Sequence, residues 1–210
     1  MIVLSHRGYW KEKKEKNQVV SFKRSFSLGF GTETDIRDYN GELVISHDIA
    51  EEDCISVEDF LKIYNSYDQT LPLALNVKAD GLQSKLKELL NKYNITNYFV
   101  FDMSVPDELG YLKENIKAFT RESEYEKVPS FYDESCGIWL DEFKSHWITK
   151  EIIENHLKNN KQICIVSPDL HKREYIKEWQ HYKEIEKESG INNLIICTDY
   201  PEIAKEFFNE

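Results

Sequence analysis

The sequence lacks most of the features that mark a specialised class of protein. Its four cysteines are never spaced as Cys-x-x-Cys. This gives no sign of a zinc site or a disulfide framework, so we expect free thiols in a reducing compartment. There is no apolar run long enough to span a membrane and no recognisable signal peptide. We therefore expect a cytoplasmic location.

Positive charge is also scarce. Lysine and arginine number 27 against 38 aspartates and glutamates, which gives a net charge of −11. An excess of this size argues against non-specific binding to nucleic acid or to an anionic membrane. A small anionic substrate still fits, because one local positive pocket is enough to bind it. The expected partner is thus a small molecule, and the oligomeric state is not encoded in any visible pattern.

The chain also lacks a linker, a low-complexity tract or a break in composition. At 210 residues and 40% hydrophobic content it is long enough for one sizeable core. We expect a single domain over residues 1–210.

Short apolar runs recur along the chain, and helical stripes lie between most of them. The runs predict strands at 2–4, 32–36, 73–77, 98–101, 118–120, 137–140, 163–166 and 194–197. The stripes predict helices around 57–64, 82–93, 152–157, 175–185 and 201–208. This alternation is typical of an α/β protein with a parallel sheet and helical crossovers. Eight strands favour a compact (β/α)8 TIM barrel, and a doubly wound open sheet is the alternative.

One hairpin interrupts the alternation. Asn40-Gly41 between two apolar runs predicts a tight turn, after which residues 43–45 return along the preceding strand. This return brings His47 towards the end of the strand that carries Glu33 and Asp35.

The polar residues that follow these strands suit phosphodiester chemistry. Glu33 and Asp35 share one face of a strand, and paired carboxylates bind Mg²⁺ or Ca²⁺. His6 and His47 can transfer protons near neutral pH, and Arg7 offers a planar fork for phosphate oxygens. In β/α barrels such residues gather at the carboxyl ends of the strands. Further polar strand ends are provided by Asn76 with Lys78, by Asp102, by Arg121 and by Asp199.

The order of these motifs resembles the glycerophosphodiester phosphodiesterases, within the phospholipase C-like phosphodiesterase barrels. The matching residues are His6-Arg7-Gly8, Asn17 with Phe22, Leu28-Gly29, Glu33-x-Asp35-Ile36, Asn40-Gly41, His47-Asp48 and Thr198-Asp199-Tyr200-Pro201. The resemblance spans both ends of the chain and is specific for the superfamily rather than for a substrate.

The resemblance implies a role for each matching residue. His6 and His47 would be the acid–base pair, and Glu33 and Asp35 the metal ligands. Arg7 would contact the phosphate. By the same resemblance, Lys78 matches the lysine of the family's Glu-x-Lys motif.

The chain departs from the family at two places. Asn76 stands where the family has a metal-binding glutamate, so an amide oxygen would complete the metal site, or Asp102 would supply the missing carboxylate. The segment between His47 and Asn76 is short, whereas a larger insertion that grips glycerol is typical of the family. This layout resembles the sphingomyelinase D-like and bacterial phosphoinositide-cleaving relatives.

Two weaker candidates lie later in the chain. Arg121 is a candidate contact for substrate hydroxyls or a second phosphate, and a charged loop is the plain alternative. Trp139 is a candidate stacking platform, and simple packing is the alternative. The function we expect is a metal-dependent phosphodiesterase. A catalytically lapsed barrel that binds a phosphorylated ligand is the main alternative, and a Schiff-base enzyme built on Lys78 is a weaker one.

Overall fold

The computed structural model describes residues 1–209 as alternating strands and helices. In chain order the elements are β1 (Ile2–His6), η1 (Lys13–Glu15), α1 (Val19–Ser27), β2 (Gly31–Tyr39), β3 (Glu42–Ile45), α2 (Val57–Tyr64), β4 (Leu73–Val77), α3 (Gln83–Lys92), β5 (Tyr98–Phe101), α4 (Val105–Lys113), β6 (Phe119–Ser123), β7 (Gly137–Asp141), α5 (Lys150–Lys158), β8 (Gln162–Val166), η2 (Pro168–His171), α6 (Ile176–Ser189), β9 (Ile195–Thr198) and α7 (Pro201–Asn209). Within these residues, no helix combines the length and the apolar character needed to cross a membrane.

The chain forms two compact units. The N-terminal unit is Ser5–Ala118, and the C-terminal unit comprises Met1–Leu4 together with the chain from Phe119 onward. β1 therefore contributes its first residues to one unit and its last two to the other. All the candidate site residues except Arg121, Trp139 and Asp199 belong to the N-terminal unit.

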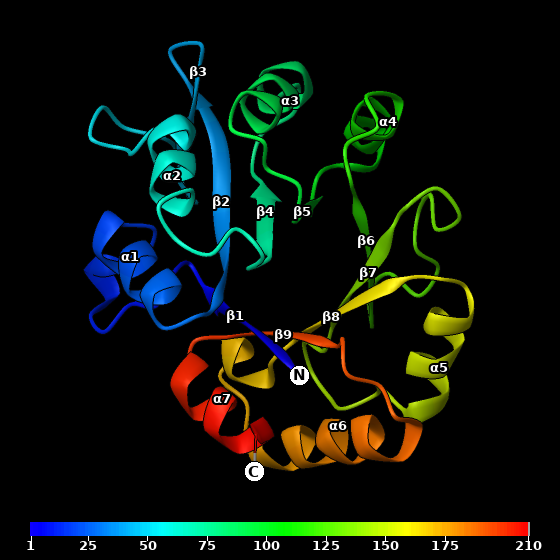
Figure 1. Ribbon diagram of the computed structural model, residues 1–210. Helices are drawn as coiled ribbons and strands as arrows, with labels where there is room; N and C mark the ends of the chain where they lie inside the picture. Colours follow the sequence, from blue (N-terminus) through cyan, green and yellow to red (C-terminus); the bar gives the residue numbers. More distant parts are fainter. Residues whose placement is uncertain (210) are drawn as a thin grey trace. The chain divides into compact units, whose positions relative to one another are not determined.

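The N-terminal unit is built on strands in the order β5-β4-β2-β1, and β3 pairs with the free part of β2. β2, β4 and β5 run parallel, so their carboxyl ends share one edge of the sheet. Every residue of β4 is buried, which is typical of a parallel strand covered on both faces. Helices α1 and α2 pack against each other, and α2 also contacts β3 (Figure 1).

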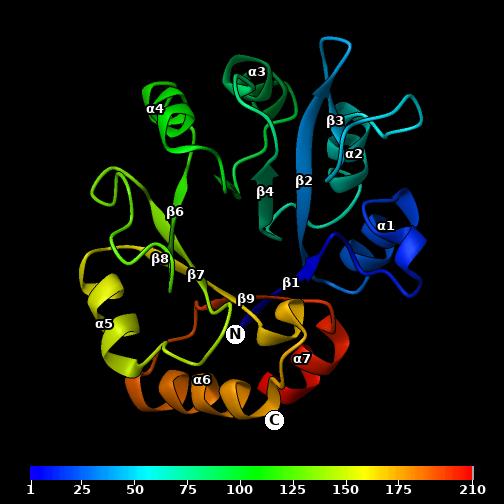
Figure 2. The same ribbon diagram turned by 180° about the vertical axis from the view of Figure 1, so that it is seen from behind.

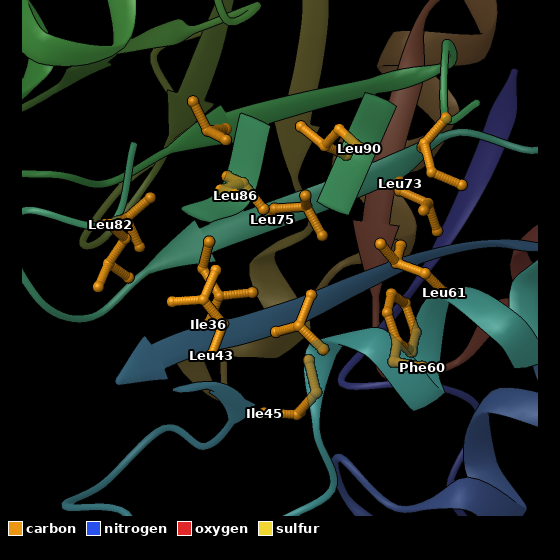
Figure 3. Packing of buried hydrophobic residues seen from close by; sticks show 14 of the residues in the cluster. Ile36, Leu43, Ile45, Phe60, Leu61, Leu73, Leu75, Leu82, Leu86 and Leu90 are labelled. Atoms are coloured by element: carbon orange, nitrogen blue, oxygen red, sulfur yellow. The ribbon is translucent and has the colours of Figure 1, made fainter. Parts of the chain in front are cut away.

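The hydrophobic core of this unit lies between its strands and α2 and α3. Figure 3 shows leucines of α3 meeting side chains of β2 and β4. Phe22 of α1 and Phe60 of α2 pack edge to face, with ring centroids 4.7 Å apart. The buried members include Ile36, Leu43, Ile45, Phe60, Leu61, Leu73, Leu75, Leu82, Leu86 and Leu90. This core fixes the strands whose ends carry the candidate site.

The predicted hairpin is confirmed. Asn40 and Gly41 have φ values of 49° and 82°, which is the left-handed pair that a type I′ turn requires. β2 and β3 then pair antiparallel from Tyr39 and Glu42 back to Ile36 and Ile45.

The C-terminal unit contains β1, β9, β8, β7 and β6, side by side in that order. β6 pairs parallel with β7, β7 with β8, and β8 with β9. α5 lies along β8 and α7 along β9 (Figure 2). Trp179 and Tyr182 of α6 are fully buried and contribute to the packing of this unit.

Two helices, α1 and α4, are not marked by a clear stripe in the sequence. In α1 the buried positions alternate between phenylalanine and serine, because Ser21 and Ser25 are as buried as Phe22 and Phe26. Ser25 satisfies its hydroxyl by bonding Ser5 and Thr32 in the sheet below. Because serine is a polar residue, its buried positions do not add to the hydrophobic periodicity that would predict this helix from the sequence.

Candidate active site

The turn after β1 begins the candidate site. Arg7 and Gly8 both have left-handed backbone, with φ of 57° and 76°. A Cβ at Gly8 would lie 2.5 Å from the Ser21 hydroxyl oxygen, so only glycine lets this turn approach α1 so closely. The turn directs the backbone N–H of Arg7 to the carboxylate of Glu33, at 3.0 Å.

Glu33 and Asp35 occupy the same face of β2, as their spacing predicts, and both are buried. The Nε2 atom of His6 lies 3.9 Å from Glu33 Oε2. The Nε atom of Arg7 lies 3.1 Å from Asp35 Oδ2. The structure therefore brings the first histidine, the arginine and the two carboxylates together.

Burial and the adjacent Asp35 raise the pKa of Glu33 from its ordinary value of 4.5 to about 7. His6 and Arg7 act in the opposite direction, because positive charge favours the ionised carboxylate. A pair of buried carboxylates that repel each other in this way is a natural place for a cation.

Asn76 lies opposite Asp35 in the register of β2 and β4. It is 8% exposed, and its Oδ1 atom is buried without a hydrogen-bond donor. Asp35 Oδ1 is likewise buried without a hydrogen bond. Two neighbouring residues thus each keep a buried oxygen that accepts no hydrogen bond within the described residues, although Lys78 forms an ion pair with that of Asp35.

Lys78 follows β4 and is held between two carboxylates. Its Nζ atom lies 3.5 Å from Asp35 Oδ1 and 3.7 Å from Asp102 Oδ2. Asp102 has a left-handed φ of 69°, which is uncommon for a residue other than glycine. The predicted strand-end residues of β2, β4 and β5 therefore do converge.

His47 is carried by the loop after β3. The backbone N–H of Ser46 donates to the carbonyl of Asp35 at 3.1 Å, so the hairpin returns to the strand that carries the carboxylates. The Nδ1 atom of His47 lies 2.9 Å from Asp48 Oδ1, and this hydrogen bond lowers the pKa of Asp48. The His47 side chain is 43% exposed, more than that of His6 at 17%.

Asn17 is a site residue to which the motif comparison gave no role. Its side-chain amide donates to Asp35 Oδ2 at 2.8 Å and accepts from the Thr34 hydroxyl at 2.9 Å. Asn17 is one of the residues that match the family motifs, and this match was the signal that could have indicated the contact.

Arg121 and Trp139 lie in the C-terminal unit, opposite each other in the register of β6 and β7. Arg121 forms an ion pair with Glu126, and its guanidinium lies 5.9 Å from the ring centroid of Phe143. Trp139 is 5% exposed. Their proposed contacts with substrate remain predictions.

The same unit contains a histidine–carboxylate pair that sequence reasoning missed. His171 Nε2 lies 2.6 Å from Asp141 Oδ1, and the His171 ring packs on Phe143 with centroids 4.6 Å apart. Asp141 is the last residue of β7, and a carboxylate at a strand end was the available signal.

The residues of the N-terminal unit fit a divalent cation. Among residues 1–209 there is no group of three or more His, Cys, Asp or Glu side chains arranged to hold a metal ion. This is consistent with Asn76 in the place of a third carboxylate, because two carboxylates and one amide oxygen are an acceptable set of hard donors. The buried oxygens of Asp35 and Asn76 are the acceptors that such a cation would use.

No family model and no curated protein sequence matches this chain. Its structure is similar to that of a glycerophosphodiester phosphodiesterase from Agrobacterium tumefaciens str. C58, with a TM-score of 0.69 and 13% identity over 100% of both chains. It is also similar to a glycerophosphoryl diester phosphodiesterase from Parabacteroides distasonis ATCC 8503, with a TM-score of 0.70 and 13% identity over 99% of this chain and 86% of that one.

A third similar structure is a phosphodiesterase from Oleispira antarctica, solved with its product sn-glycerol-3-phosphate. The TM-score is 0.67 and the identity 12%, over 100% of this chain and 97% of that one. At such low identity the likeness establishes the fold and not the chemistry. The predicted fold is thus confirmed, and the doubly wound alternative is wrong: this chain has the (β/α)8 barrel fold that it shares with these phosphodiesterases.

Proposed function

We propose that this protein is a metal-dependent phosphodiesterase that cleaves a small phosphodiester by acid–base catalysis. The observation that carries the proposal is the set of contacts around Asp35. Two cationic side chains form ion pairs with this buried carboxylate, Arg7 with Oδ2 and Lys78 with Oδ1, and Oδ1 accepts no hydrogen bond. Such a group combines a cation-binding oxygen with donors for an anionic phosphate.

The charges support a bound divalent cation. Glu33, Asp35 and Asp102 bring three carboxyl groups to the site, against the two cations Arg7 and Lys78. With all three carboxyl groups ionised, an anionic phosphodiester would meet net repulsion unless more positive charge were present. In this proposal Glu33, Asp35 and Asn76 hold Mg²⁺ or Ca²⁺. The bound ion would polarise a phosphoryl oxygen as a Lewis acid.

The protein's own groups divide the remaining work. In this proposal Arg7 donates to two phosphate oxygens, a contact that a planar and permanently charged guanidinium suits. Lys78 adds a second positive charge where negative charge develops during attack. One histidine of the pair His6 and His47 takes a proton from the attacking hydroxyl, and the other gives a proton to the leaving oxygen.

The nearest substrate class is a glycerophosphodiester. The fold is shared with enzymes named for that activity, and the Oleispira antarctica enzyme holds sn-glycerol-3-phosphate. Nucleotide- or sugar-linked phosphodiesters are the other candidates within the class, because the segment between His47 and Asn76 is short. Contacts from Arg121 and Trp139 with the rest of the substrate, and a cytoplasmic location, belong to the same proposal.

The test is turnover of glycerophosphocholine and of bis(4-nitrophenyl) phosphate, followed by phosphorus NMR. We expect cleavage with Mg²⁺ or Ca²⁺, loss of cleavage in EDTA, and recovery when the ion is returned. A cyclic phosphate product would indicate attack by a neighbouring substrate hydroxyl, and an acyclic monoester would indicate attack by water. Unchanged turnover in chelator would overturn the metal requirement.

A second function is favoured by one observation. Asn76 leaves the proposed cation site without a third carboxylate, and a protein that only binds a phosphorylated ligand has no need of one. This alternative predicts no turnover with any ion, together with calorimetric binding of glycerol 3-phosphate that is lost in Arg7→Ala.

A further inference from the structure

Asn17 connects the turn after β1 to the strand that carries the carboxylates. Its backbone N–H donates to the carbonyl of Arg7 at 2.9 Å. Its Nδ2 atom donates to Asp35 Oδ2 at 2.8 Å, and its Oδ1 atom accepts from Thr34 Oγ1 at 2.9 Å. Asn17 is only 8% exposed, so water does not compete well for these bonds.

The orientation of the Asn17 amide follows from the chemistry of its partners. An ionised carboxylate can only accept hydrogen bonds, so the nitrogen end of the amide must face Asp35. The oxygen end is then left for the hydroxyl of Thr34, which donates to it. One side chain therefore satisfies two neighbours with opposite requirements.

The position of Asn17 depends on where β1 ends. Thr34 and Asp35 are successive residues of β2, and successive side chains point to opposite faces of a sheet. A side chain that reaches both must lie at the edge of the strand. β1 is the neighbour of β2 on this edge and stops at His6, whereas β2 continues to Tyr39. Asn17 lies next to the part of the edge beyond β1.

The backbone at this position also favours asparagine. Asn17 has a left-handed φ of 58°. Asparagine and glycine are the residues that adopt this conformation most readily. Only asparagine adds an amide that can donate to a carboxylate, so two independent requirements select the same residue.

We infer that Asn17 is a positioning residue that orients the carboxylate of Asp35. The hydrogen bond from Asn17 and the ion pair with Arg7 hold Oδ2 and so fix the plane of the carboxylate. In this plane Oδ1 faces Lys78 and would face a bound cation. The inference rests on the proposed function, because it takes Asp35 as a cation ligand. Residues that hold a metal ligand in place typically change metal affinity or activity by about 10–100-fold when they are removed.

Asn17→Gly is the most direct test. Glycine keeps the left-handed backbone and the N–H that bonds Arg7, so only the side-chain bonds are lost. We expect the Kd for Mg²⁺, measured by calorimetry, to rise by about 10–100-fold, with kcat/KM falling by a similar factor at limiting Mg²⁺. Saturating Mg²⁺ should restore much of kcat.

Two companion variants separate positioning from simple stability. Thr34→Val keeps the shape of the side chain but removes the donor that orients the amide, so it should weaken Mg²⁺ binding in the same direction and by less. Asn94→Gly is the matched control, because Asn94 has a left-handed φ of 53° and is exposed. It should leave the Kd for Mg²⁺ unchanged.

The outcomes are distinguishable. A lower melting temperature in EDTA with an unchanged Kd for Mg²⁺ would mean that Asn17 serves stability alone, and the inference would be overturned. An active wild type whose Asn17→Gly variant binds Mg²⁺ normally overturns this inference and leaves the proposed function intact. A wild type that neither binds a divalent ion nor cleaves a phosphodiester overturns both.

Discussion

Asp35 and Asn76 are register partners on β2 and β4, and each keeps a buried side-chain oxygen without a hydrogen-bond donor. Buried acceptors of this kind are normally satisfied by the protein or by a bound species. One of the two residues is charged and the other is neutral. The pair therefore offers a direct way to test whether a cation binds between these strands.

Asn76→Glu should tighten the binding of Mg²⁺ or Ca²⁺, because hard cations prefer charged oxygen. Calorimetric titration of both proteins measures the change, which we expect to be about tenfold or more because cation affinity follows the number of charged ligands. The rate need not rise, since the added charge repels the anionic substrate and weakens the ion as a Lewis acid.

A charge-matched control is Asn91→Glu, which makes the same substitution at an exposed position of α3. It should leave the affinity unchanged. If a correctly folded Asn76→Glu also shows the wild-type Kd, Asn76 is not a cation ligand, and Asp102 becomes the next residue to replace.

Substitutions of the two histidines should lower kcat to a similar extent but should differ in their effect on stability. His6→Ala and His47→Ala should each lower kcat by about 10²–10⁴, the usual range for acid–base groups. His47 is the more exposed, so its variant should retain the wild-type melting temperature more closely. Steady-state kinetics with saturating Mg²⁺ provides the measurement. A variant with near-normal turnover would remove that histidine from the mechanism.

The parts of the site that the sequence predicts are those whose geometry is local. Glu33 and Asp35 share a face because strand side chains alternate, and the Asn40-Gly41 turn fixes the return of the chain towards them. Those relations involve neighbouring residues, so a pattern in the sequence is enough to reveal them.

The contacts that sequence reasoning missed join distant segments. Asn17 and Asp35 are 18 residues apart, and Asp141 and His171 are 30 apart. The first depends on a left-handed backbone and on where β1 stops, and neither has a periodic signature. The second depends on a 3-10 turn after β8 that turns His171 back towards β7. Such contacts require the folded chain.

The raised pKa of Glu33 predicts a pH dependence of stability in the absence of metal. Burial and Asp35 raise this pKa from 4.5 to about 7, so the folded protein keeps a proton that the unfolded chain releases. The stability contributed by the protonated group is full below the unfolded pKa and is lost as the pH rises through the folded one.

In EDTA, the free energy of unfolding of the wild type should therefore fall between about pH 4.5 and about pH 7 relative to that of Glu33→Gln. Denaturant titration of the two proteins across this range gives the difference. Mg²⁺ should reverse the trend, because a cation favours the ionised carboxylate. A difference that stays flat with pH would show that Glu33 keeps its ordinary pKa.

Substitution of Gly8, in the turn that carries Arg7, should destabilise the protein more than the same substitution at Gly81. Gly8→Ala combines a left-handed φ of 76° with a Cβ that would lie 2.5 Å from the Ser21 hydroxyl and 3.0 Å from the Ser21 backbone carbon. Gly81→Ala is its matched control, because Gly81 has a φ of 83° and nothing within 4 Å of the added Cβ. Backbone strain alone costs about 1–3 kcal/mol in either variant.

The steric clash adds to this cost only at Gly8. It also moves the turn in which the backbone N–H of Arg7 donates to Glu33. Denaturant unfolding should therefore show a larger loss for Gly8→Ala, and kinetics should show reduced kcat/KM for that variant alone. Equal losses of stability in the two variants would mean that α1 yields to the added methyl group and that this close approach does not constrain the site.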